Sequence, residues 1–121
     1  MNKIEYKAEE KRPEAEGLSE EELEIFDLLI AGKKLTKDEE QKVKLSAKNL
    51  FKKLSAEKAE LMVVDWYKDE QPRAKVKTAI ETSLDADLPD TYDKETFVAK
   101  TDLLLTHFID MAIQGYGWVA A

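Results

Sequence analysis

The 121-residue sequence contains no cysteine, a single histidine, 4 glycines and 3 prolines. Without cysteine, neither a disulfide nor a thiolate zinc site can form, and the chain suits a reducing compartment. The scarcity of glycine and proline excludes fibrous and low-complexity classes and favours long helices. No apolar run approaches the roughly 20 residues that a transmembrane helix needs. No membrane partner is therefore expected.

The N-terminal stretch MNKIEYKAEEKRPEAEG is too charged for a signal peptide. The cytoplasm is therefore the predicted location. Pro13 opposes one long helix through this stretch. Residues 1–16 are predicted to be a polar lead-in, at most a frayed helix, and residues 17–121 to be a helical domain.

The chain also lacks an excess of basic residues, with 26 acidic against 19 basic residues and a net charge of −7. Domains that bind duplex DNA on their own usually gain affinity from excess Lys and Arg. Nucleic acid should therefore repel the chain as a whole, although the sequence leaves a local basic face open.

The sequence does contain strong helix boundary signals. Ser19 and Glu22 have the spacing of a capping box, and Gly32 can end that helix in a left-handed conformation. Thr36 and Glu39 repeat the capping box at the start of a second helix. The apolar residues of this second helix recur with the period of an amphipathic helix: Val43, Ala47, Leu50, Phe51 and Leu54.

The rest of the chain is also predicted to be helical. Ser55 can cap a third helix that carries Leu61 to Trp66, and Pro72 is expected to break or kink the chain. The stretch DADLPDTYD, residues 85–93, is a predicted loop, because Asp, Pro and Thr cluster there. Two further helices are predicted around this loop, one with Val76, Ala79, Ile80 and Leu84 on one face, and one over residues 94–114 with the stripe Phe97, Thr101, Leu104, Leu105, Phe108 and Ala112. No two-residue alternation indicates a sheet, so the predicted fold is a single all-α domain of five to six helices.

The stretch LMVVD, residues 61–65, has the form of a Walker B strand, in which the aspartate holds a magnesium ion. Such a site also needs a phosphate loop, and the one Gly-Lys pair, Gly32-Lys33, is followed by Lys34 rather than Ser or Thr. Asp65 is therefore not expected to hold the magnesium ion of a bound nucleotide. The alternative is that residues 61–64 pack in a helical core while Asp65 is solvated or paired.

Two other catalytic patterns are incomplete. Pro89-Asp90 resembles the first half of a metal-dependent nuclease motif, but no Asp or Glu stands two residues before a Lys after it. His107 has no cysteine or second histidine with which to share a metal, and no general acid–base partner can be named for it. No catalytic residue, metal site or cofactor site is therefore predicted in this chain.

Two groups of side chains remain as candidates for binding. Lys42, Lys44, Lys48 and Lys52 lie largely outside the apolar stripe of their helix and either form a solvated face or contact phosphates. Trp66, Tyr67, Tyr116 and Trp118, with Arg73 close to the first pair, belong to the residue types that dominate protein interfaces. Aromatic residues are equally common in protein cores, and the sequence alone does not decide between the two.

Three stretches, in this order, resemble the C-terminal helical domain of type I restriction enzyme R subunits. They are GLSEEELEIFDLL (Gly17 to Leu29), DWYKDEQPRAKVKTAIE (Asp65 to Glu81) and LPDTYDKETFVAKTDLLLTHF (Leu88 to Phe108). The similarity covers about Gly17 to Trp118.

The resemblance implies a larger parent polypeptide with a nuclease domain and two motor domains, which uses ATP and Mg²⁺ to translocate DNA before cutting it. It also implies methyltransferase (M) and specificity (S) subunits as partners, with duplex DNA bound through the whole complex. None of the parent's catalytic motifs matches a position here, so this chain alone is expected neither to hydrolyse ATP nor to cleave DNA. Its expected role is assembly, through a surface at Trp66, Tyr67, Arg73, Tyr116 and Trp118. The alternatives are a module that contacts translocating duplex DNA, and an unrelated small helical adaptor.

Overall fold

The computed structural model describes residues 17–114, and these contain helices and no strand. The elements are α2 (Glu20–Ile30), α3 (Lys37–Ala56), α4 (Lys58–Leu61), the 3₁₀ turn η2 (Trp66–Lys68), α5 (Glu70–Asp87) and α6 (Lys94–Gln114). The predicted single all-α domain without a sheet is confirmed. The lead-in of residues 1–16 and the tail of residues 115–121 lie outside the described residues.

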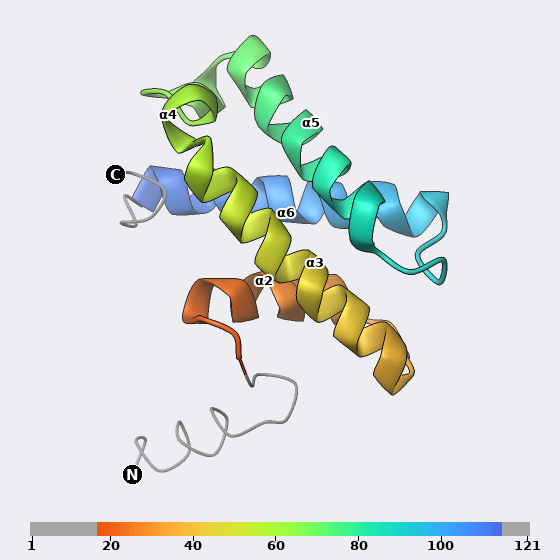
Figure 1. Cartoon of the computed structure of the whole chain (residues 1–121). Coiled ribbons are helices and arrows are strands. Elements are labelled where there is room, and N and C mark those ends of the chain that lie inside the picture. The colour runs from red at the N-terminus through yellow and green to blue at the C-terminus, as the bar shows by residue number, and fades with distance from the viewer. Residues whose placement is uncertain (1–16, 115–121) are drawn as a thin grey trace, which may run out of the picture.

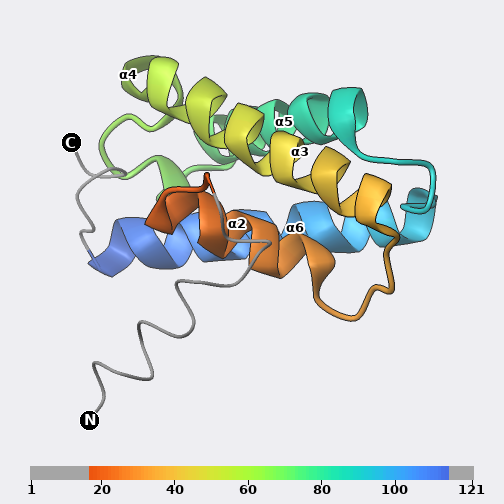
Figure 2. The same cartoon turned by 60° about the horizontal axis from the view of Figure 1, so that its bottom comes forward.

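The four long helices form two layers. Figure 2 shows α3 and α5 lying over α2 and α6, and in Figure 1 α3 crosses both helices of the other layer. α3 packs against α2 and α5, while α6 packs against α5 and α2. The core fills the space between the layers and draws its largest buried side chains from all four: Ile25, Phe26, Leu29, Val43, Leu50, Leu54, Val76, Ile80, Leu84, Leu104 and Phe108.

Both predicted capping boxes are present. Ser19 Oγ accepts a hydrogen bond from the Glu22 backbone N–H at 3.2 Å, and the Glu22 carboxylate accepts one from the Ser19 N–H at 2.8 Å. Thr36 and Glu39 make the same pair of bonds at 3.1 and 2.9 Å. Gly32 follows α2 with φ +77°, the left-handed conformation predicted from its position.

The predicted third helix is wrong. α3 continues through Ser55 to Ala56, so Ser55 is a helical residue and caps nothing. α4 is a single turn, and from Met62 the chain bends until η2 begins at Trp66. Met62 and Trp66 are both buried, whereas Val63 and Val64 between them are exposed. Residues 61–64 therefore do not form the helical core segment that the sequence suggested: the helix ends at Leu61, and the chain passes through the left-handed Asp65 before η2 begins.

Pro72 does not break a helix. It lies in the first turn of α5, where a backbone N–H has no intrahelical partner and its loss costs little. The interruption falls earlier, at residues 62–69, and Gln71 is helical. The face with Val76, Ala79, Ile80 and Leu84 is buried as predicted.

The loop before α6 is shorter than predicted. α5 runs to Asp87, so residues 85–87 are helical and only residues 88–93 connect the two helices. Pro89 and Asp90 lie in a turn closed by the Tyr92 N–H on the Pro89 carbonyl at 3.0 Å, which is the structural role predicted for them.

α6 has the predicted bounds, Lys94–Gln114. Of the predicted stripe, Thr101, Leu104 and Phe108 are buried, whereas Phe97, Leu105 and Ala112 are only partly buried. Lys100 and Met111 are buried on the same side, which the stripe did not include. Among the described residues, no helix combines the length and apolar character needed to cross a membrane.

Candidate interaction surfaces

A buried lysine closes the C-terminal end of α2. Lys100 Nζ donates hydrogen bonds to the Leu28 carbonyl at 2.8 Å and the Ala31 carbonyl at 2.7 Å, and Lys100 is only 8% exposed. A cation is favourable there, because the last carbonyls of a helix carry the negative end of its dipole. Burial lowers the pKa of Lys100, and the nearby charge of Lys33 lowers it further. The lysine thus joins α6 to α2 rather than facing a ligand.

The loop between α5 and α6 is fastened to the turn between α2 and α3. The Tyr92 hydroxyl donates to the Leu29 carbonyl at 2.7 Å, and Lys33 Nζ donates to the Thr91 carbonyl at 3.0 Å and lies 5.0 Å from the centre of the Tyr92 ring. The Thr91 hydroxyl donates to the Glu39 carboxylate, and this bond is the largest cause of the lowered pKa of Glu39. These groups act mainly on one another and on backbone carbonyls, so we assign the cluster to the fold rather than to catalysis.

The Tyr92→Phe variant should reveal this fastening through its pH dependence. Burial, and secondly the charge of Glu39, raise the pKa of Tyr92 from 10.0 to about 12. The neutral phenol is therefore favoured in the folded state, and its contribution is complete below pH 10 and lost as the pH rises to about 12. At neutral pH the variant should be less stable than the wild type by about 1 kcal/mol, the typical net value of one hydrogen bond.

Urea unfolding of both proteins from pH 8 to pH 12 measures this difference. The gap between wild type and variant should close at the alkaline end, since only the wild type must keep a buried phenol protonated. If the difference in unfolding free energy stayed constant across this range, the pKa of Tyr92 would have to be the same in the folded and unfolded states.

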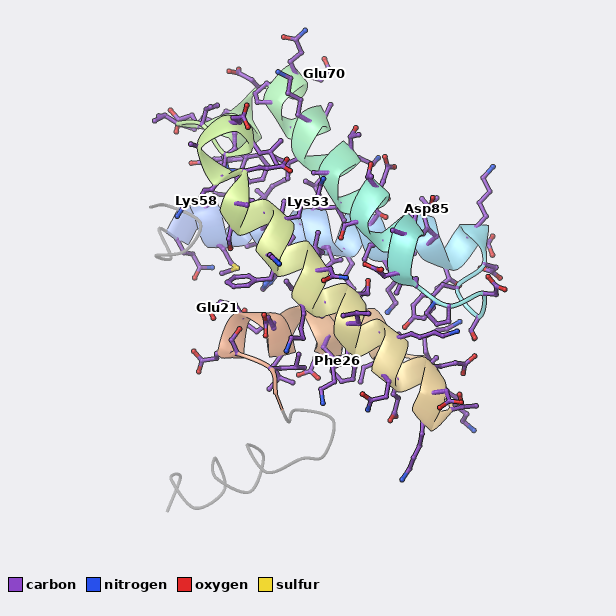
Figure 3. The ribbon with its side chains drawn as sticks, viewed as in Figure 1. Glu21, Phe26, Lys53, Lys58, Glu70 and Asp85 are labelled. Atoms are coloured by element: carbon purple, nitrogen blue, oxygen red, sulfur yellow. The ribbon has the colours of Figure 1, made fainter. Side chains whose placement is uncertain are left out.

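A second feature is an exposed apolar corner, which we define as Val63, Val64, Tyr67 and Arg73. Val64 is 90% exposed and Val63 44% exposed. Both belong to the segment that joins α4 to α5, and Figure 3 labels the first residues of these two helices, Lys58 and Glu70. Tyr67 is half-buried and receives a hydrogen bond on its carbonyl from Arg73 Nη1 at 3.0 Å. The corner therefore ties η2 to α5.

Two neighbouring residues, the exposed Asp65 and the buried Trp66, hold the shape of the corner. Asp65 has φ +58°, a left-handed conformation that Asp tolerates better than most residues, and its carboxylate lies 3.7 Å from Lys68 Nζ. Trp66 is 2% exposed and meets the Tyr67 ring edge to face, with ring centres 5.9 Å apart. A groove of 480 Å³ lies between Lys53, Glu57 and Leu61 on one side and residues 71–82 of α5 on the other. Leu61 and Ala74 of this groove are close in sequence to Val63 and Arg73 of the corner.

The third feature is the outer side of α3. Lys48 and Lys52 are exposed, Lys44 is half-buried, and Leu45 between them is 52% exposed. A shallow groove of 630 Å³ follows this side and is lined by Glu22, Leu45, Lys48, Asn49, Phe51, Lys52, Ser55 and Ala56. The open lysine face that the sequence suggested is thus present on the folded chain.

The remaining candidate residues have ordinary surroundings. Asp65 is on a turn rather than at the end of a strand. His107 Nε2 lies 3.4 Å from the Glu24 carboxylate, and this contact between a partly buried and an exposed side chain joins α6 to α2. Within residues 17–114, no group of three His, Cys, Asp or Glu side chains is placed to hold a metal ion.

The family assignment follows from the sequence. A model of the family described as "Type I restriction enzyme HindI endonuclease subunit-like, C-terminal" matches residues 2–111 of the chain. The chain belongs to this family. No curated protein and no solved structure is significantly similar to it. The resemblance to type I restriction enzyme R subunits is therefore confirmed. The match covers nearly all of the residues that the structure describes.

The structure separates the aromatic residues that the sequence grouped together. Trp66 belongs to the core of this type I restriction subunit domain, while Tyr67 and Arg73 remain partly accessible. Tyr116 and Trp118 lie outside the described residues. Whether any of them contacts a partner stays a prediction.

Sequence reasoning missed two features of the type I restriction subunit domain. Val63 and Val64 belong to an apolar run that suggests burial, and no local signal announced the turn that exposes them. Lys100 could have been found, because it stands four residues before Leu104 and three after Phe97, within the apolar stripe of α6.

Proposed function

We propose that this domain docks the endonuclease subunit of a type I restriction enzyme onto the methyltransferase and specificity subunits of the complex. Family membership supports a place in a multisubunit enzyme. Neither a phosphate loop nor a complete nuclease motif occurs in this chain. The proposal therefore assigns the nuclease activity and the ATP- and Mg²⁺-dependent motor activity to other parts of the subunit.

The observation that carries the proposal is the exposed apolar corner. Val64 projects almost fully into solvent from a chain segment that is anchored on both sides by the buried Met62 and Trp66. Exposed apolar groups on a rigid support favour association, because little conformational freedom is lost on binding. Tyr67 and Arg73 beside them are of the residue types that most often dominate binding energy.

The groove next to the corner supports a protein partner. Its α5 wall has four small residues, Ala74, Thr78, Ala79 and Thr82, together with Gln71 and Lys75, and its other wall has Lys53, Glu57 and Leu61. Small side chains on one wall let a helix or loop of a partner approach the backbone closely. The corner and the groove together would form one continuous docking surface.

The proposal is tested by the Val64→Asp variant in the full endonuclease subunit. A carboxylate placed in an apolar contact must be buried without a partner, which opposes binding strongly. We expect the affinity for the purified methyltransferase–specificity core to fall by more than about tenfold, in line with a cost of at least 1.4 kcal/mol. Isothermal titration calorimetry or analytical ultracentrifugation measures this affinity.

Val98→Asp is the matched control. Val98 is an exposed valine on α6, away from the corner, so the same change of side chain and charge is made on another face. Both variants should melt within a few degrees of the wild type, since neither replaced side chain is in the core. Equal affinities for Val64→Asp, Val98→Asp and the wild type would remove the corner from the docking surface.

A further inference from the structure

Acidic and basic residues are distributed very differently along α3. Its three acidic residues, Asp38, Glu39 and Glu40, all lie in the first turn, where they suit the positive end of the helix dipole. From Gln41 to Ala56 the helix has five lysines and no acidic residue, in a chain whose net charge is −7. We define the α3 lysine face as Lys44, Leu45, Lys48, Asn49 and Lys52.

The lysine charges of this face are not neutralised by described acidic side chains. Lys48 Nζ donates to the carbonyl of Gly17 at 3.0 Å, a neutral group, and no described carboxylate lies within ion-pair distance of Lys44 or Lys52. Two carboxylates border the face, Glu22 in the groove and Asp87 beside Asn49, but neither forms an ion pair with Lys44, Lys48 or Lys52, so the lysines outnumber them. The face therefore presents a local positive charge despite the acidic composition of the chain.

The geometry of the face suits a regular array of anions. Lys44, Lys48 and Lys52 are four residues apart, so their Cα atoms follow one side of the helix at steps of about 6 Å and span about 12 Å. Duplex DNA carries one negative charge per roughly 1.7 Å of its axis. Each step of four residues also turns by about 40° around the helix, so the three lysines form an inclined row that can face several phosphates at once.

The composition of the face argues for DNA rather than for a protein partner. Lysine is depleted in protein interfaces, which favour aromatic residues, Met and Arg. The α3 lysine face has no arginine and no tyrosine or tryptophan, whereas the corner formed by Val63, Val64, Tyr67 and Arg73 has both Tyr and Arg. Lysine binds phosphate as a point charge and needs no fixed geometry to do so.

We propose that the α3 lysine face binds the phosphate backbone of duplex DNA, without reading its sequence. Lys44, Lys48 and Lys52 contact phosphates, and the neighbouring Asn49 side chain is half-buried and donates to Asp87 at 3.0 Å, so it is occupied within the fold. The face lies on α3, while the corner is formed by the segment before α5 and by α5 itself, so the two surfaces can be occupied together. The proposal does not depend on the docking function.

The test measures binding of the 121-residue chain to a short fluorescent DNA duplex by anisotropy at several salt concentrations. Three phosphate contacts predict that the logarithm of the association constant falls with the logarithm of the salt concentration with a slope of about −2.7. The triple variant Lys44→Gln, Lys48→Gln, Lys52→Gln should lose more than about tenfold in affinity at low salt and most of this slope. Two duplexes of different sequence should bind the wild type equally.

A second triple variant controls for net charge. This variant removes three positive charges from exposed positions outside α3, by the changes Lys34→Gln, Lys75→Gln and Lys94→Gln. It should keep most of the affinity for DNA and most of the salt slope. Equal losses in the two variants, or no binding of the wild type at low salt, would overturn the proposal. The proposal would also be overturned if a polyglutamate peptide displaced the labelled duplex as readily as an unlabelled duplex of equal charge. The face would then be a general site for acidic surfaces. None of these results bears on the affinity for the methyltransferase–specificity core.

Discussion

The Trp66→Ala variant is expected to lose about 3–5 kcal/mol of unfolding free energy, a large part of the stability of a domain of this size. Trp66 is 2% exposed and lies in the core cluster with residues of all four long helices. Removing its indole leaves a cavity that the packed helices can fill only in part. Chemical unfolding in urea, or the midpoint of thermal unfolding by circular dichroism, measures the loss.

Tyr67→Ala is the natural comparison. Tyr67 follows Trp66 directly but is only partly buried, so truncating it should cost clearly less stability. For docking, we expect the reverse order of effects, because Tyr67 is accessible to a partner and Trp66 is not. If Trp66→Ala melted like the wild type, the indole could not be a core side chain, and its role at an interface would return.

Leu104→Ala is expected to lose about 2–5 kcal/mol, as fully buried leucines do when a cavity is left behind. The side chain lies at the middle of α6, which packs on both α2 and α5. Its loss should therefore loosen both layers and lower the midpoint of urea unfolding.

The adjacent Leu105 provides a matched control within the same turn. The periodicity of α6 placed both leucines in the core stripe, but Leu105 is only partly buried. Leu105→Ala should cost less than Leu104→Ala, since part of its surface is already in contact with water. If the two variants lost the same unfolding free energy, Leu105 would have to be as fully buried as Leu104.

Local signals in the sequence determined both ends of α2 and the start of α3, and the predicted bounds of α6 also agree with the structure. Ser19 with Glu22, and Thr36 with Glu39, each satisfy backbone groups three residues away, so the sequence alone indicates both capping boxes. Gly32 likewise ends α2 through its own backbone freedom. The apolar period of 3.6 placed the core faces of α3 and α5, and the order of three short stretches was enough to indicate the family.

Longer-range packing decided the segment around Trp66. Serine is a common residue at the start of a helix, so Ser55 suggested a new helix there. In the structure α3 instead continues past Ser55, with Leu54 buried, and the chain turns only after α4. The apolar run from Leu61 to Val64 cannot itself say which of its members face the core. That depends on the bend at the left-handed Asp65, which buries Met62 and Trp66 and exposes Val64.

The sequence by itself thus determined the all-α class, the family and the absence of a complete phosphate loop or nuclease motif in this chain, because these rest on local preferences and on short motifs. Only the tertiary structure decided that Trp66 is a core residue, that Val64 projects from a fixed corner, and that Lys100 is buried against the end of α2. Each of these outcomes depends on which surface of another helix comes to lie against the residue. Such contacts join residues far apart along the chain, as Lys100 and Leu28 are. The stripe of α6 can place Lys100 on the core side of its helix, but no local pattern identifies the carbonyls that it meets.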